Sequence, residues 1–159
     1  MYSRTGKELK CPESYKLHLP PLALDGELWV KRGLQQSALQ LSRSRSEDLW
    51  KSSTFCIFDA PNQNKPYEDR VQFLKKLQKD SNWPKFLSVV EPIQCKSREH
   101  LKEFMKEIID MKGEGVMLRE PQSLYEAGRS KSMRRYKEFK DTEVLVVKNM
   151  YPHGLECQQ

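Results

Sequence analysis

The sequence lacks any apolar run long enough to cross a membrane as a helix. Such a helix needs about 20 consecutive, mostly apolar residues, and the basic residues near the start are not followed by an apolar segment of the secretory kind. We therefore expect a soluble intracellular protein with no signal peptide and no membrane partner. Its compartment is not indicated; it would be the nucleus or a mitochondrion if the organism is eukaryotic.

Cysteine and histidine are also scarce, and neither forms a metal-binding pattern. The 4 cysteines and 3 histidines are dispersed along the chain, with no Cys-x-x-Cys pair. A zinc site or a disulfide framework is therefore not expected, and reduced thiols fit an intracellular protein better.

Apolar residues make up only 37% of the chain, whereas charged residues make up 31%. A length of 159 residues allows one domain of ordinary size. The composition predicts a thin core beneath a wide solvated surface, which is also typical of a piece of a larger domain.

The charge is unevenly placed. The chain carries 28 basic and 22 acidic residues, for a net charge of +6. A basic segment lies near the C-terminus and contains Arg129, Lys131, Arg134, Arg135, Lys137 and Lys140. A solvated face explains many such segments. Binding of a polyanion is the alternative, since phosphates attract clustered Lys and Arg without contacts to bases.

Two periodicities predict the secondary structure. Strands are expected at 22–30, at 53–58 before Asp59-Ala60-Pro61, at 115–119 and at 142–148. A helix is expected from Pro66, with its apolar face marked by the spacing of Tyr67, Val71, Leu74 and Leu77.

A second helix is expected after Ser97 as N-cap, ending at Lys112 and Gly113. Strands in tandem, separated by two surface helices, predict an α+β fold with largely antiparallel sheets.

Four short segments contain the candidate functional residues: DGELW at 25–29, FCIFD at 55–59, EGVMLR at 114–119 and RYK at 135–137. Each alone has an ordinary structural explanation as a solvated acid, a core aromatic or a surface lysine. Together and in this order, they resemble motifs III, IIIa, IV and V of the covalent nucleotidyltransferases, and most closely those of ATP-dependent DNA ligases. Ser3-Arg4-Thr5-Gly6 resembles the segment that follows the nucleophile motif in ligases.

The resemblance implies an incomplete ligase adenylation domain, ATP-grasp-like, over residues 1–148, with 149–159 beginning a linker toward an oligonucleotide-binding domain. It implies sealing of nicked double-stranded DNA through lysyl-AMP and DNA-adenylate intermediates, in DNA repair, replication or recombination. The cofactors would be ATP and Mg²⁺ or Mn²⁺, and we expect a monomer.

The resemblance also assigns roles to individual residues. Glu27 would contact the ribose or help to hold a divalent metal, Phe58 would stack on adenine, and Glu114 would be the main metal-binding carboxylate. Lys137, and Arg135 in place of the usual lysine, would neutralise the α-phosphate; with Glu114 they are the candidate catalytic residues. The DNA phosphates would be met by Arg4 and Arg32.

The sequence departs from the family pattern at several points. Lys31 and Gln35 replace the usual glycine and phenylalanine after motif III, and Arg135 replaces a lysine, so a planar fork stands in place of a point charge. The nucleophile motif Lys-x-Asp-Gly is absent, and its place in the family order lies upstream of Ser3. We therefore expect that this chain does not self-adenylylate.

Two alternatives to a DNA ligase stay open at this stage. The first keeps the fold but makes the chain an RNA ligase or an mRNA capping nucleotidyltransferase, which uses GTP. The second is a non-catalytic, nucleic-acid-binding pseudo-ligase that retains the basic face without the chemistry.

Overall fold

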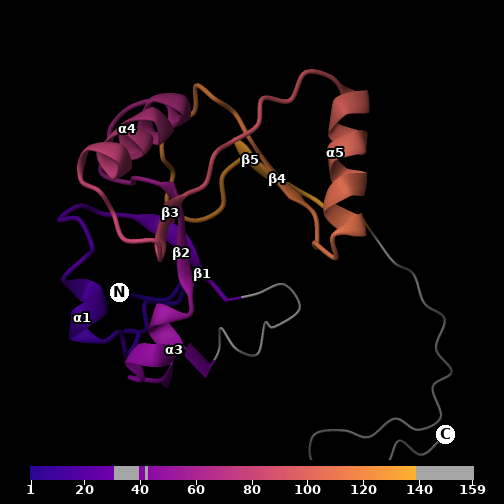
Figure 1. Ribbon diagram of the computed structural model, residues 1–159. Helices are drawn as coiled ribbons and strands as arrows, with labels where there is room; N and C mark the ends of the chain where they lie inside the picture. The colour runs from indigo at the N-terminus through magenta and orange to yellow at the C-terminus, as the bar shows by residue number, and fades with distance from the viewer. Residues whose placement is uncertain (31–39, 42, 139–159) are drawn as a thin grey trace, which may run out of the picture.

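A computed structural model describes residues 1–30, 40–41 and 43–138 (Figure 1). Its elements in chain order are α1 (Glu13–Lys16), β1 (Asp25–Trp29), α3 (Glu47–Lys51), β2 (Thr54–Asp59), α4 (Tyr67–Asp80), β3 (Leu87–Val89), α5 (Arg98–Asp110), β4 (Val116–Arg119) and β5 (Met133–Tyr136). The α+β class expected from the sequence is confirmed. The expected strand at 142–148 lies outside the described residues.

Strands β1, β2 and β3 form one sheet in that order. β1 runs antiparallel to β2, with Glu27 opposite Cys56, whereas β2 and β3 are parallel. Along β2 the buried residues alternate with half-buried ones, as a strand with one face on a core must. Phe55 and Ile57 therefore face the core, and Cys56 and Phe58 face the other way.

The core beneath this sheet is built around aromatic side chains. Tyr15 lies edge-on to Trp50 at a centroid distance of 5.0 Å and stacks on Phe86 at 4.3 Å. The Trp50 indole nitrogen donates a hydrogen bond of 2.8 Å to the Ser44 carbonyl, so its one polar group is satisfied although the side chain is fully buried. Only 11 hydrophobic residues are buried in the described part, in agreement with the thin core expected from the composition.

The two longer helices begin where the sequence predicts. α4 starts directly after Pro66 and buries Val71 and Leu74; it lies beside the three-stranded sheet in Figure 1. α5 is capped by Ser97, whose hydroxyl oxygen accepts a hydrogen bond from the His100 amide at 3.1 Å.

The C-terminal end of α5 differs in detail from the expectation. The residue with left-handed backbone is Lys112, at φ 61°, and not Gly113. The Lys112 and Gly113 amides donate to the carbonyls of Ile109 and Ile108, at 2.8 and 2.7 Å. These two bonds form a Schellman motif, which satisfies the carbonyls at the end of the helix.

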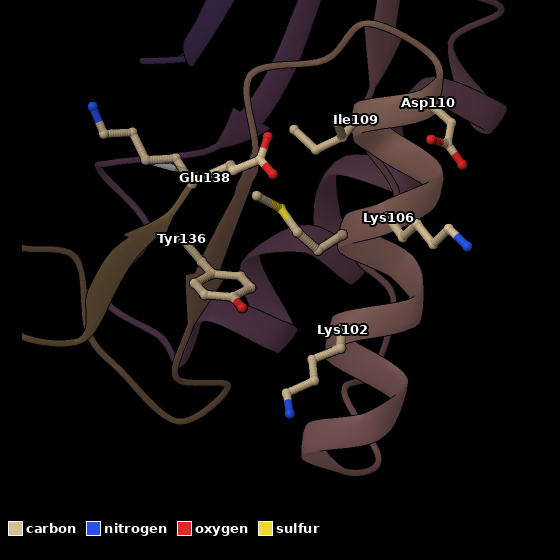
Figure 2. A pocket seen from close by; sticks show the side chains of 8 residues that line it. Lys102, Lys106, Ile109, Asp110, Tyr136 and Glu138 are labelled. Carbon is tan, nitrogen blue, oxygen red and sulfur yellow. The ribbon is translucent and has the colours of Figure 1, made fainter. Parts of the chain in front are cut away.

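Strands β4 and β5 pair antiparallel in a second sheet, with Met117 opposite Arg135 and Arg119 opposite Met133. This sheet lies between the three-stranded sheet and α5 in Figure 1. Figure 2 shows the ring of Tyr136 on the side of β5 that faces α5, where the two elements border a groove. No helix among the described residues is long and apolar enough to span a bilayer.

Candidate functional site

The first part of the site is the face of the three-stranded sheet that points away from the core. Glu27 is exposed on β1 and lies opposite the half-buried Cys56, while Phe58 follows two residues further along β2 on the same side. Burial, and then the negative charge of Glu27, raise the pKa of the Cys56 thiol. An acid and a half-exposed aromatic ring are thus presented together on one open surface.

Gly26 makes this strand pairing possible. A Cβ atom at this position would lie 2.7 Å from the Cys56 carbonyl oxygen and 2.7 Å from the Phe55 ring. Both distances are shorter than real Cβ contacts allow, so the glycine lets β1 approach β2 closely just before Glu27.

The second part of the site lies at the start of β4. Arg135 donates a hydrogen bond from Nη2 to Glu114 Oε2 at 2.5 Å, across side chains that are 53% and 63% exposed. Gly115 follows at φ +146°, and a Cβ there would lie 2.3 Å from the Tyr136 carbonyl oxygen. The close approach of these two backbones therefore places Glu114 within reach of Arg135.

The strand register shows which way Arg135 points. Side chains directly opposite one another share a face, so Arg135 and Met117 lie on the same side of the sheet as Arg119 and Met133. Arg119 Nη2 forms an ion pair of 2.8 Å with Asp59 Oδ2 at the end of β2. The Arg135 face is therefore turned toward the three-stranded sheet, and the Tyr136 face is turned toward α5.

The remaining site residues predicted from the sequence are Lys137, Arg4 and Arg32. Lys137 is exposed and directly follows β5. Arg4 is exposed in a tight turn in which the Gly6 amide donates to the Ser3 carbonyl at 2.9 Å. Arg32 lies outside the described residues. The structure thus groups Glu27 with Phe58 and Glu114 with Arg135, each pair on its own sheet.

A polar cluster that was not predicted from the sequence joins the two sheets, and Asp59 and Arg70 at its centre are fully buried. Asp59 accepts from Arg70 Nε at 2.6 Å and Nη2 at 2.9 Å, in addition to its contact with Arg119. Asp25, whose Cα pairs with that of Asp59, accepts a hydrogen bond of 3.0 Å from the Tyr125 hydroxyl. We call Asp25, Asp59, Arg70, Arg119 and Tyr125 the two-aspartate cluster.

One sequence signal could have revealed part of this cluster. Arg70 lies three residues after Tyr67 and four before Leu74, so it falls on the apolar face of the expected helix. A buried arginine requires an acidic partner, and Asp59 closes the neighbouring strand.

The comparisons with known proteins show the family of the chain. A family model described as the ATP dependent DNA ligase domain matches residues 2–137. The chain belongs to the ATP-dependent DNA ligase family. A DNA ligase from Haemophilus influenzae is 28% identical over 149 residues, covering 92% of this chain and 54% of that protein.

Two solved ligase structures have the same fold. A Lig E DNA ligase, studied for DNA binding with a minimal scaffold, superposes with a TM-score of 0.77 at 26% identity, over 87% of this chain and 55% of that one. The Chlorella virus DNA ligase-adenylate superposes with a TM-score of 0.73 at 23% identity, over 89% and 57%. The chain spans about half the length of these relatives.

The acidic residues present suit a nucleotide-bound metal better than a metal held by protein alone. The described residues contain no group of three or more His, Cys, Asp or Glu side chains arranged to hold an ion. Mg²⁺ keeps several waters and is commonly bound by one or two carboxylates together with substrate phosphates. Glu27 and Glu114 are both exposed carboxylates, so either could provide one such ligand.

Proposed function

We propose that this chain provides the nucleotide-binding part of an ATP-dependent DNA ligase that seals nicks in double-stranded DNA. The proposed reaction would serve DNA repair, replication or recombination. The observation that carries this proposal is the ion pair between Arg119 and Asp59, which joins the strand face that carries Arg135 to the end of β2, next to Phe58. In this proposal, acids, cations and an aromatic ring on the two sheets would surround one nucleotide.

Each residue type fits a part of ATP. The half-buried Phe58 ring offers a face for adenine; such stacking on a base contributes about 1–3 kcal/mol. Glu27 lies opposite Cys56, two residues before Phe58 on β2. Its carboxylate would accept hydrogen bonds from the ribose hydroxyls. Arg135 and Lys137 would neutralise phosphate charge, which is the main requirement in phosphoryl chemistry.

Glu114 has a double role in this proposal. Its carboxylate pairs with Arg135 in the structure, and it would bind a phosphate-bound Mg²⁺ or Mn²⁺ when ATP is present, releasing Arg135 toward the α-phosphate. The metal would lower the charge repulsion on the phosphates. Arg4 would contact the 5′-phosphate of the nick.

Equilibrium dialysis with labelled ATP and Mg²⁺ tests the nucleotide site. Phe58→Ala should weaken ATP binding about 5- to 150-fold, from the loss of one stacked base, and Glu114→Gln should lose the increase in affinity that Mg²⁺ produces. Glu47→Gln is the matched control, because Glu47 forms an exposed ion pair with Lys51 on α3. Wild-type affinity in both site variants, or tighter binding of GTP than of ATP, would contradict the proposal.

A nick carrying a 5′-adenylate tests the DNA part of the proposal. We expect the chain to bind this DNA more tightly than an intact duplex, with an affinity that falls as salt is raised and that is weakened by Arg4→Ala. The affinity for nicked DNA could instead be the same with and without ATP, and the same in Glu114→Ala. That result would favour a non-catalytic nucleic-acid-binding module.

A further inference from the structure

The two-aspartate cluster places two carboxylates at the same end of β1 and β2. Asp25 and Asp59 are Cα partners in the antiparallel pair, at the point where a register shift interrupts the ladder. Like charges in such positions destabilise a sheet unless other groups compensate them. The groups that contact Asp25 and Asp59 therefore offset this repulsion at the end of the sheet.

All the compensating groups come from outside β1 and β2. Arg70 belongs to α4, Arg119 is the last residue of β4, and Tyr125 lies in the segment between β4 and β5. Asp59 and Arg70 are fully buried, and the Arg119 side chain is 13% exposed. Asp59, Arg70 and Arg119 therefore form a largely buried polar junction between the two sheets and α4, with Asp25 and Tyr125 half-buried beside it.

The segment between β4 and β5 is held at several points near this junction. Arg70 Nη1 donates to the Ser123 carbonyl at 3.0 Å, and the Glu68 amide donates to the Pro121 carbonyl at 3.0 Å. Gln122 Nε2 also donates to Glu68 Oε1. Tyr125 is thus presented to Asp25 by a segment that is itself attached to α4.

Arg119 joins the end of β4 to the cluster through one oxygen of Asp59. Its guanidinium lies 4.8 Å from the centre of the Tyr67 ring, and its buried Nε has no hydrogen-bond partner among the described residues. Its Nη1 also donates to Met133 Sδ at 3.6 Å within the β4–β5 pair, so the Asp59 ion pair and the Tyr67 ring link this pair of strands to β2 and α4. A change at Asp59 can therefore reach the second sheet through Arg119.

We infer that Tyr125 and Arg119 are positioning residues of the nucleotide site, which set Glu27 and Phe58 in register with Glu114 and Arg135 by holding Asp25 and Asp59. This inference rests on the proposed function. Asp25 is two residues from Glu27, Asp59 directly follows Phe58, and Arg119 shares a strand face with Arg135. Neither Tyr125 nor Arg119 contacts the nucleotide in this scheme.

Tyr125→Phe is the sharpest test, because it removes one hydroxyl and keeps the ring. We expect about a tenfold loss of affinity for Mg·ATP, from one hydrogen bond to a carboxylate. In NMR spectra, we expect shifts in the amide resonances of both Gly26 on β1 and Gly115 before β4. Arg119→Lys, which keeps the charge but not the planar fork, should change the same two resonances.

Two controls separate positioning from stability. Tyr2→Phe makes the same chemical change at a side chain that is 73% exposed, and it should change neither readout. Val71→Ala removes buried methyl groups from α4 and should lower the thermal midpoint without changing the affinity for Mg·ATP.

The outcomes distinguish this inference from the proposed function. If Tyr125→Phe and Arg119→Lys leave the Gly115 resonance in place and retain wild-type affinity, the inference is wrong even though ATP binds. If the wild type binds no ATP, the proposed function fails, and the Gly115 resonance alone decides whether the cluster couples the sheets. If Tyr125→Phe does not fold, the same comparison is made with Arg119→Lys.

Discussion

Replacing Arg70 by methionine is expected to destabilise the protein strongly. Methionine fills a similar space, so the change mainly removes the charged guanidinium. The guanidinium is fully buried, donates twice to Asp59, and also donates to the carbonyls of Lys65 and Ser123 at 2.5 and 3.0 Å. Removing one member of a buried ion pair costs about 3–5 kcal/mol, because the remaining charge loses its compensation. For a domain of this size, the thermal midpoint should fall by about 6–20 °C.

Part of the penalty in Arg70→Met is the uncompensated charge of Asp59. That aspartate keeps its ion pair with Arg119 and a 2.8 Å hydrogen bond from the Ala60 amide. Adding Asp59→Asn removes the charge, so the double variant should be more stable than the sum of the two single effects, by about 0.5–3 kcal/mol. The free energies would be measured by urea unfolding.

The matched control for this series is Lys51→Met on α3. Lys51 pairs with Glu47 at 3.2 Å, but the side chains are 62% and 54% exposed. An exposed pair of this kind contributes about 0.3–0.5 kcal/mol. The free energy of unfolding of Arg70→Met could instead lie within about 1 kcal/mol of the wild type, or Lys51→Met could cost as much as Arg70→Met. Either result would show that the buried ion pair of Arg70 does not stabilise the fold more than an exposed one.

Two further predictions follow from single positions. Gly115→Ala should lower the free energy of unfolding in urea by more than about 1 kcal/mol, because the new Cβ would meet the Tyr136 carbonyl oxygen. Gly6→Ala is the control: Gly6 has φ +78° but lies in open space, so this change should cost less. Equal costs would show that close approach of the Gly115 backbone to Tyr136 is not the cause. Burial raises the pKa of Tyr15 from 10.0 to about 12, so its neutral form stabilises the fold below pH 10 and this contribution is lost as the pH rises through 12. Tyr15→Phe should therefore reduce the alkaline loss of unfolding free energy by about 2–3 kcal/mol, and an unchanged pH profile would argue against a buried, neutral Tyr15.

The sequence predicted the elements whose signals are local. Ser97 and Pro66 mark the starts of α5 and α4, and the apolar spacing that follows is independent of the rest of the chain. Strands β1 and β2 were also predicted, although β1 begins at Asp25 and not at Leu22. The flanking prolines explain this difference, since the chain before β1 is a turn-rich loop.

The elements that were missed depend on distant partners. β3 has only three residues and is a strand because it pairs with β2. β5, with the sequence Met-Arg-Arg-Tyr, contains two exposed arginines and reads as a solvated basic segment. Its backbone is ordered by β4, and the burial of Arg70 likewise follows from Asp59 on another element. Such pairings depend on tertiary structure, which local sequence patterns do not encode.

The candidate site was predicted as residue types rather than as an arrangement. The motifs identified Glu27, Phe58, Glu114 and Arg135, but not the ion pair between the last two or the cluster that joins their sheets. Lys137 and Arg4 keep their proposed roles as predictions. Arg32 lies outside the described residues.

Residue-by-residue mapping of ATP binding by NMR would show directly whether the two sheets share one nucleotide site. With ATP and Mg²⁺ added to the wild-type chain, we predict that the largest amide shifts fall at Gly26, Glu27, Phe58, Glu114 and Arg135, in both sheets at once. Shifts confined to the groove between α5 and Tyr136, or to one of the two sheets alone, would contradict a nucleotide site formed by both sheets.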